Sequence, residues 1–137
     1  MKAFVAKAAV ADERAKTFEL RGQKTMYGGK SIAVGDTVFV FASETEGGSG
    51  LIARGVVVSA QSVAKKAGVQ RQTPRVNVTV KRVSLSKRRL GRSELKAFSK
   101  WDDGRPETEL NFKFYRQATN KIVGLSESAA AFLKDFF

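Results

Sequence analysis

The chain has 137 residues, 42% of them hydrophobic, which is enough to build a core, and we expect a single domain over residues 1–137. It contains neither cysteine nor histidine, so disulfides, thiolate metal sites and histidine-based catalysis are excluded, and no catalytic residue, metal or cofactor is predicted. Twenty-five Lys and Arg against thirteen Asp and Glu give a net charge of +12, which favours a polyanionic partner, with nucleic acid ahead of anionic lipid.

The first half of the chain is predicted to form three strands and one helix. A continuous apolar run at Thr37–Ala42, after the turn Val34-Gly35-Asp36, is typical of a strand buried on both faces. Asp12 is a suitable N-cap for a helix ending at Leu20, and three glycines indicate a loop at Arg21–Lys30. The remaining strands are expected at Lys2–Val10 and Leu51–Ser59.

The second half is predicted to alternate between strands and short helices. Valines at every second position indicate a strand with one buried face at Arg75–Val83. Ser126 is a suitable N-cap for a final helix with an apolar face. The other elements are expected to be a helix at Ser93–Ser99, a polar loop at Lys100–Leu110 and a strand at Asn111–Tyr115. This order predicts an α+β fold, a small mixed β-barrel with helices packed on its outside.

The positive charge is concentrated in one segment. Eleven lysines and arginines lie between Lys65 and Lys96, and no acidic residue precedes Glu94 in that stretch. Such a cluster is typical either of a solvated surface or of contacts with a nucleic-acid backbone. We predict phosphate contacts from Lys65, Lys66, Arg71, Arg75, Arg82, Lys87, Arg88, Arg89 and Arg92.

Two stretches contain candidates for binding a base. Trp101, in the polar segment SKWDDGRPE, is either a wall of a pocket or a plug against the core. On the predicted last strand, Phe112 and Phe114 share one face and are explained as core residues. Tyr115, Arg116 and Asn120 are then candidates for a site, with Arg116 binding phosphate or a base acceptor and Asn120 binding a base edge.

The sequence resembles the EVE domain of the PUA-like superfamily. The resemblance rests on AVGDTVFVFAS, GLIARGVVVSA, RVNVTVKRVSL, SELKAF and GLSESAAAFLKDFF, which occur in the family's order over most of the chain. Typical EVE strands have tyrosine and histidine before the serine, whereas Phe41 and Ala42 precede Ser43 here. The resemblance implies a barrel that binds nucleic acid and accepts a modified base in a pocket. By position it adds Lys24, Tyr27 and Ser43 to the pocket.

The predicted function is therefore recognition of a modified base in an aromatic pocket beside a basic surface, on DNA or RNA. A flipped base needs both aromatic stacking and fixed hydrogen-bond partners, and this chain contains both. One alternative is an RNA-binding protein of translation or RNA modification that contacts the backbone only. Another is a nuclease with Mg²⁺ at Asp102, Asp103, Glu107 and Glu109. We expect a cytoplasmic monomer that is not an enzyme and does not contact membrane, since no stretch approaches the roughly 18 apolar residues of a membrane span.

Overall fold

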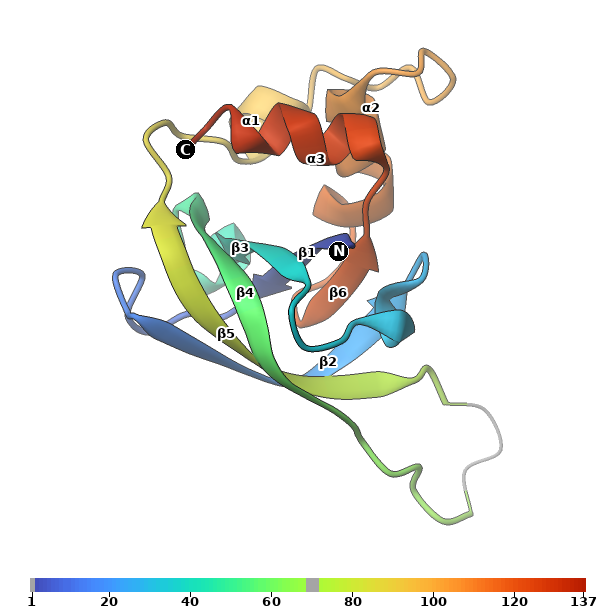
Figure 1. The fold of residues 1–137 in the computed structure, drawn as a ribbon. Coiled ribbons are helices and arrows are strands. Elements are labelled where there is room, and N and C mark those ends of the chain that lie inside the picture. The colour runs from blue at the N-terminus through green and yellow to red at the C-terminus, as the bar shows by residue number, and fades with distance from the viewer. Residues whose placement is uncertain (1, 69–71) are drawn as a thin grey trace.

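Six strands close into a barrel in the computed structural model, which describes residues 2–68 and 72–137 (Figure 1). Around the barrel the order is β1-β3-β4-β5-β2-β6. The pairs β1–β3 and β2–β6 are parallel and the other four are antiparallel, so the barrel is mixed, as predicted. The strands are β1 (Ala3–Ala8), β2 (Thr17–Met26), β3 (Thr37–Ala42), β4 (Gly50–Ser62), β5 (Arg75–Leu85) and β6 (Lys121–Gly124).

Helices cover one end of the barrel (Figure 1). They are α1 (Arg92–Leu95), α2 (Pro106–Leu110), the π-helical turn η3 (Asn111–Tyr115) and α3 (Glu127–Lys134). Two short 3₁₀ turns, η1 (Gly29–Ser31) and η2 (Glu44–Glu46), flank β3. The Ser126 hydroxyl accepts a hydrogen bond from the Ala129 amide at 3.2 Å, which confirms the predicted N-cap of α3. Within the described residues, each helix is too short or too polar to cross a membrane.

Strand β3 is buried on both faces because it lies between two cores. Val38, Val40 and Ala42 point into the barrel interior, where they join one apolar cluster. Phe39 and Phe41 point the other way, into a second cluster beneath the helices. The continuous apolar run therefore meets a barrel interior on one side and a helical layer on the other.

Four predicted elements are wrong, and two strands were missed. One wrong element is the polar loop at Lys100–Leu110, whose last five residues form α2. The helix at Asp12–Leu20 and the loop at Arg21–Lys30 are replaced by β2, in which Phe18 and Leu20 alternate with exposed residues. The strand expected at Asn111–Tyr115 is the π-helical turn η3, continuous with α2. Phe112 and Phe114 therefore do not share a strand face, although Phe114 is a core residue as expected. The missed strands are β2 and β6, and β6 closes the barrel between β1 and β2.

Candidate functional site

A cavity of about 650 Å³ opens where β1 and β3 end beneath η3, and we call it the Tyr115 cavity. On β3 the face that carries Phe39 and Phe41 continues to Ser43, and on β1 the face that carries Val5 continues to Lys7. The helical layer completes the wall from the opposite side. The lining residues are Lys7, Ser43, Glu44, Thr45, Arg92, Lys96, Ser99, Asn111, Tyr115, Arg116, Gln117, Ala118 and Thr119.

Lys7 is a buried cation at the base of this cavity. Its ammonium donates to the backbone carbonyls of Tyr115, at 3.0 Å, and Gln117. It also lies 5.1 Å from the centre of the Tyr115 ring. Burial and then the nearby Lys121 ammonium lower the pKa of Lys7, against the opposing effect of Glu44. Lys7 thus ties the end of η3 to the barrel and brings positive charge to the cavity.

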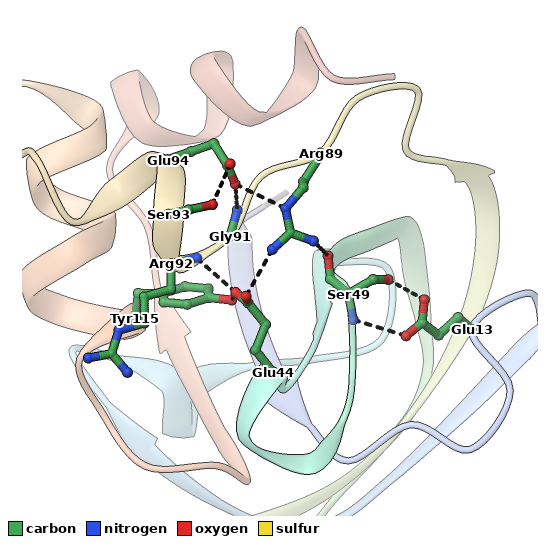
Figure 2. A network of polar contacts seen from close by, with 9 residues as sticks. All are labelled: Glu13, Glu44, Ser49, Arg89, Gly91, Arg92, Ser93, Glu94 and Tyr115. Carbon is green, nitrogen blue, oxygen red and sulfur yellow. Dashed lines mark hydrogen bonds and ion pairs between the residues drawn. The ribbon is translucent and has the colours of Figure 1, made fainter.

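Glu44 is the centre of a polar network that fixes the wall of the Tyr115 cavity opposite Lys7 (Figure 2). Its carboxylate accepts hydrogen bonds from the Tyr115 hydroxyl, from the Arg92 amide at 2.7 Å and from Arg89 Nη2 at 2.9 Å. Burial opposes ionisation, but these donors and the Arg89 charge together hold the pKa of Glu44 below its usual range. Burial and the bond to Glu44 raise the pKa of Tyr115, which keeps its hydroxyl protonated as a donor.

Hydroxyl groups line the cavity beside this network. The Ser43 hydroxyl lies 2.7 Å from that of Thr119 and 3.0 Å from that of Thr45. Each hydroxyl both donates and accepts hydrogen bonds, so this group can rotate to match a ligand's polar edge. Lys7, Arg92, Lys96 and Arg116 contribute four positive charges to the wall against the single carboxylate of Glu44. The cavity therefore suits an anionic ligand that carries hydrogen-bonding groups.

A second cavity, of about 800 Å³, contains Tyr27, and we call it the Tyr27 cavity. Its wall includes Lys2, Ser31, Lys113, Glu127 and Lys134. It lies along β6, η3 and α3, and its lining shares no residue with that of the Tyr115 cavity.

The structure separates the predicted base-binding residues. Ser43, Tyr115 and Arg116 meet in the Tyr115 cavity, whereas Tyr27 lies in the other one. The three other predicted residues line neither of these two cavities. Lys24 and Asn120 are joined through their backbones at 2.9 Å, and Trp101 lies on an exposed loop with 77% of its surface accessible.

The predicted phosphate contacts are also divided. Lys65, Lys66 and Arg75 lie on or beside the hairpin between β4 and β5, whereas residues 87–92 lie at the other end of β5, beside the helices (Figure 1). The 11 residues of β5 span roughly 35 Å, so the segment does not form one compact patch. Arg71 lies outside the described residues.

Several of these arginines hydrogen-bond within the protein. Arg75 donates to the Gly22 carbonyl at 2.7 Å, and Arg82 donates to the Arg14 carbonyl at 2.6 Å. Arg88 donates to the Asp135 carbonyl at 2.9 Å. Arg92 is exposed and lines the Tyr115 cavity, so of the predicted contacts it is the one placed at the candidate site.

Two of the acidic residues proposed for Mg²⁺ accept hydrogen bonds within the helical layer. Asp103 accepts bonds from the Arg105 amide and the Thr108 hydroxyl, both at 2.9 Å. Glu109 accepts from the Ser126 amide at 3.0 Å and from its hydroxyl. Over residues 2–68 and 72–137, no group of three or more acidic side chains is arranged to hold a metal ion.

Sequence reasoning missed Lys7, Glu44 and Thr119, which are three of the thirteen residues that line the Tyr115 cavity. Lys7 could have been recognised from the sequence, because it is a charged residue inside the apolar run of β1. A lysine in such a run is buried only where its charge has partners. Glu44 follows directly after the predicted Ser43 but gave no signal, since a glutamate in a polar loop is usually solvated.

The mixed barrel with its helical cover is an EVE-like fold, which confirms the fold that the resemblance predicted. The sequence matches no family model and no curated protein. Solved structures match over nearly the whole chain. The human THYN1 protein, in complex with 5-methylcytosine-containing DNA, superposes with a TM-score of 0.66 at 16% identity, over 98% of this chain and 96% of that one.

Two further structures share the architecture. A hypothetical protein from Leishmania major has a TM-score of 0.63 at 20% identity, with 98% of this chain and 93% of that chain covered. A protein from Pseudomonas putida has a TM-score of 0.59 at 15% identity, with 98% of each chain covered. At these identities the likeness establishes the fold.

Proposed function

We propose that the chain is a nucleic-acid-binding module that accepts a modified base in the Tyr115 cavity. The observation that carries the proposal is the composition of that cavity, in which four cations surround fixed donors, acceptors and an aromatic side chain. Its volume of about 650 Å³ lies in the range of small-ligand sites, roughly 300 to 1,000 Å³. The likeness in fold to a protein crystallised with 5-methylcytosine-containing DNA supports this choice of ligand.

The residues of the cavity divide the work between phosphate and base. Arg92, Lys96 and Arg116 lie at its exposed positions and bind phosphate. The Ser43 hydroxyl and the Glu44 carboxylate lie deeper and bind the polar edge of the base. A carboxylate accepts a hydrogen bond from an exocyclic amine such as that of cytosine. The base recovers the cost of leaving its stack through these bonds and through contact with the Tyr115 ring.

The residues outside the cavity have a different role in this proposal. Trp101, with its exposed ring, stacks on a nucleotide that flanks the site. Lys24 and Asn120 support the cavity from behind, because the Asn120 amide donates to the Lys7 carbonyl at 2.7 Å.

The test compares oligonucleotides that differ only in one central base, cytosine or 5-methylcytosine, by fluorescence anisotropy in single-stranded and duplex form. We expect tighter binding of the modified strand. Arg116→Ala should weaken binding and reduce the log–log salt slope by about 0.7 to 0.9 for the lost phosphate contact. Arg21→Ala is the matched control, because Arg21 is exposed on β2 and lines neither cavity.

Three results would contradict different parts of the proposed function. Equal affinity for every modified and unmodified strand would leave a protein that binds the nucleic-acid backbone only. If Arg116→Ala and Arg21→Ala change the affinity for the oligonucleotide equally, the Tyr115 cavity does not contact the nucleic acid. Binding that does not change with salt would contradict the nucleic-acid proposal itself.

A further inference from the structure

The Tyr27 cavity combines an exposed aromatic ring with lysines from three parts of the chain. Tyr27 follows β2, Lys2 precedes β1 and Lys134 ends α3. Lys113, on η3, lies with its ammonium 5.3 Å from the centre of the Tyr27 ring. These residues are far apart in sequence, and the fold brings them to one concavity of about 800 Å³.

The conformation of Tyr27 holds its ring in the open. Its φ of 48° lies in the left-handed region, which is unusual for a bulky residue and is usually occupied by glycine or asparagine in a turn. Despite this, 53% of its surface remains exposed, so burial of the ring does not compensate for the strain. Backbone strain of this kind is concentrated at binding sites, where it holds a side chain in the position that a ligand requires at a cost in folding stability.

The charges around the ring suit an anion. Lys113 is paired with Glu109 at 3.7 Å, and the Lys2 ammonium donates weakly to the Ser31 hydroxyl at 3.4 Å. Lys134 is exposed and has no ion-pair partner among the described residues. Three ammonium groups are thus balanced by two carboxylates, that of Glu127 in the lining and that of Glu109 beside Lys113, which leaves a net positive charge. A flat ring beside flexible cations is the combination that binds unpaired nucleotides, through base stacking and phosphate contacts.

The two cavities lie on opposite sides of η3. Within this five-residue turn, Asn111 and Tyr115 line the Tyr115 cavity whereas Lys113 lines the Tyr27 cavity. Lys121 connects the two sides, because its ammonium lies 3.3 Å from Gln117 Oε1 and 3.3 Å from the sulfur of Met26, the residue before Tyr27. Positive charge therefore continues from one cavity to the other past η3.

We propose that the Tyr27 cavity is a second contact site for single-stranded nucleic acid, in which Tyr27 stacks on a base and Lys2, Lys113 and Lys134 bind phosphate. The inference rests on the proposed function for its class of ligand. It adds that a strand with its modified base in the Tyr115 cavity continues past η3 and places a neighbouring nucleotide on Tyr27.

The experiment removes the ring without adding strain. Asparagine tolerates a left-handed conformation, so Tyr27→Asn keeps the turn, and Tyr27→Phe is the matched control that keeps the ring. The first probe is a fluorescein-labelled single-stranded 12-mer with one 5-methylcytosine. The second is free 5-methyl-2′-deoxycytidine, which is too small to reach both cavities. Melting temperatures of all variants confirm that they are folded.

We expect Tyr27→Asn to weaken binding of the 12-mer about fivefold or more, because the stacking of one base is lost. Tyr27→Phe should bind the 12-mer as tightly as the wild type does. Binding of the free nucleoside should be unchanged. Lys134→Gln should lower the salt slope for the 12-mer by about 0.7, whereas Lys16→Gln, an exposed lysine outside both cavities, should not.

The failures of the two proposals are distinguishable. If Tyr27→Asn binds the 12-mer as tightly as the wild type while Arg116→Ala binds it weakly, the Tyr27 cavity is not a contact site and the proposed function stands. If Tyr27→Asn weakens binding but Arg116→Ala does not, the Tyr27 site stands and the assignment of the base to the Tyr115 cavity is wrong. A loss of nucleoside binding in Tyr27→Asn would also overturn the inference, because the two cavities would then not be separate sites.

Discussion

Replacing Glu44 by alanine should destabilise the fold and loosen the wall of the Tyr115 cavity at once. Three donors converge on this carboxylate, from the Tyr115 hydroxyl, the Arg92 amide and the Arg89 guanidinium. The Tyr115 bond is partly buried and the Arg92 bond is exposed, so each is set at the lower end of the range for hydrogen bonds to a charged group, about 1.5 kcal/mol. The Arg89 side chain is 51% exposed, so its ion pair adds only about 0.5 kcal/mol. We therefore expect Glu44→Ala to lower the free energy of unfolding by about 3.5 kcal/mol.

This loss is measurable by urea unfolding, with thermal unfolding as a second probe. In a chain of this length, 1 kcal/mol corresponds to about 3 to 4 °C, so the midpoint should fall by roughly 10 to 14 °C. Tyr115→Phe removes one of the three donors, and the double variant should lose less than the sum of the single variants, because the two residues share a bond. If Glu44→Ala lowers the midpoint by less than about 2 °C, or if the two changes are additive, the carboxylate does not organise this wall.

Four further changes test other parts of the account. Gly91→Ala should destabilise the same network, because an added Cβ would overlap Glu44 Oε1; an unchanged urea midpoint would contradict this packing. The folded-state pKa of Glu44 is lowered, so its ionisation stabilises the fold above the ordinary carboxyl pKa, and this stabilisation is lost as the pH falls below that pKa and through the lowered one. Glu44→Gln should reduce that acid-dependent loss, and identical pH profiles for the two proteins would refute it. Trp101→Ala should weaken oligonucleotide binding about fivefold or more with no change in melting temperature, since its ring is exposed; unchanged affinity would remove Trp101 from the interface. Val40→Asp should unfold the protein by burying a carboxylate inside the barrel, and a folded variant with the wild-type melting temperature would contradict the position of β3.

The barrel was predictable from sequence where one physical signal dominated. The apolar run of β3 indicated burial on two faces, and the alternating valines of β5 indicated burial on one. The error at Asn111–Tyr115 has a clear cause, since Phe112 and Phe114 alternate with polar residues as in a strand. In the structure this segment prolongs α2 as a π-helical turn, and the helical layer above β3 decides its conformation. Such tertiary contacts leave no periodicity in a short segment.

The site was predictable only in part, because cavities form where distant segments meet. Ser43 and Tyr115, which were predicted for one pocket, line one cavity, although they come from the end of β3 and from η3. Tyr27 was assigned to the same pocket, but η3 divides the region into two cavities. The spread of the basic segment over both ends of β5 was equally invisible, since neighbours in sequence become distant along an extended strand.

The most direct test of the account is a residue-resolved NMR titration of the ¹⁵N-labelled protein with a short single strand that contains one 5-methylcytosine. We expect the backbone amide signals of Ser43, Glu44 and Thr119 to shift in a saturable manner, and to shift less with the unmodified strand. The amide of Arg21 on β2 should not respond. Shifts that avoid the Tyr115 cavity, or that are the same for both strands, would contradict the claim that this cavity receives the modified base.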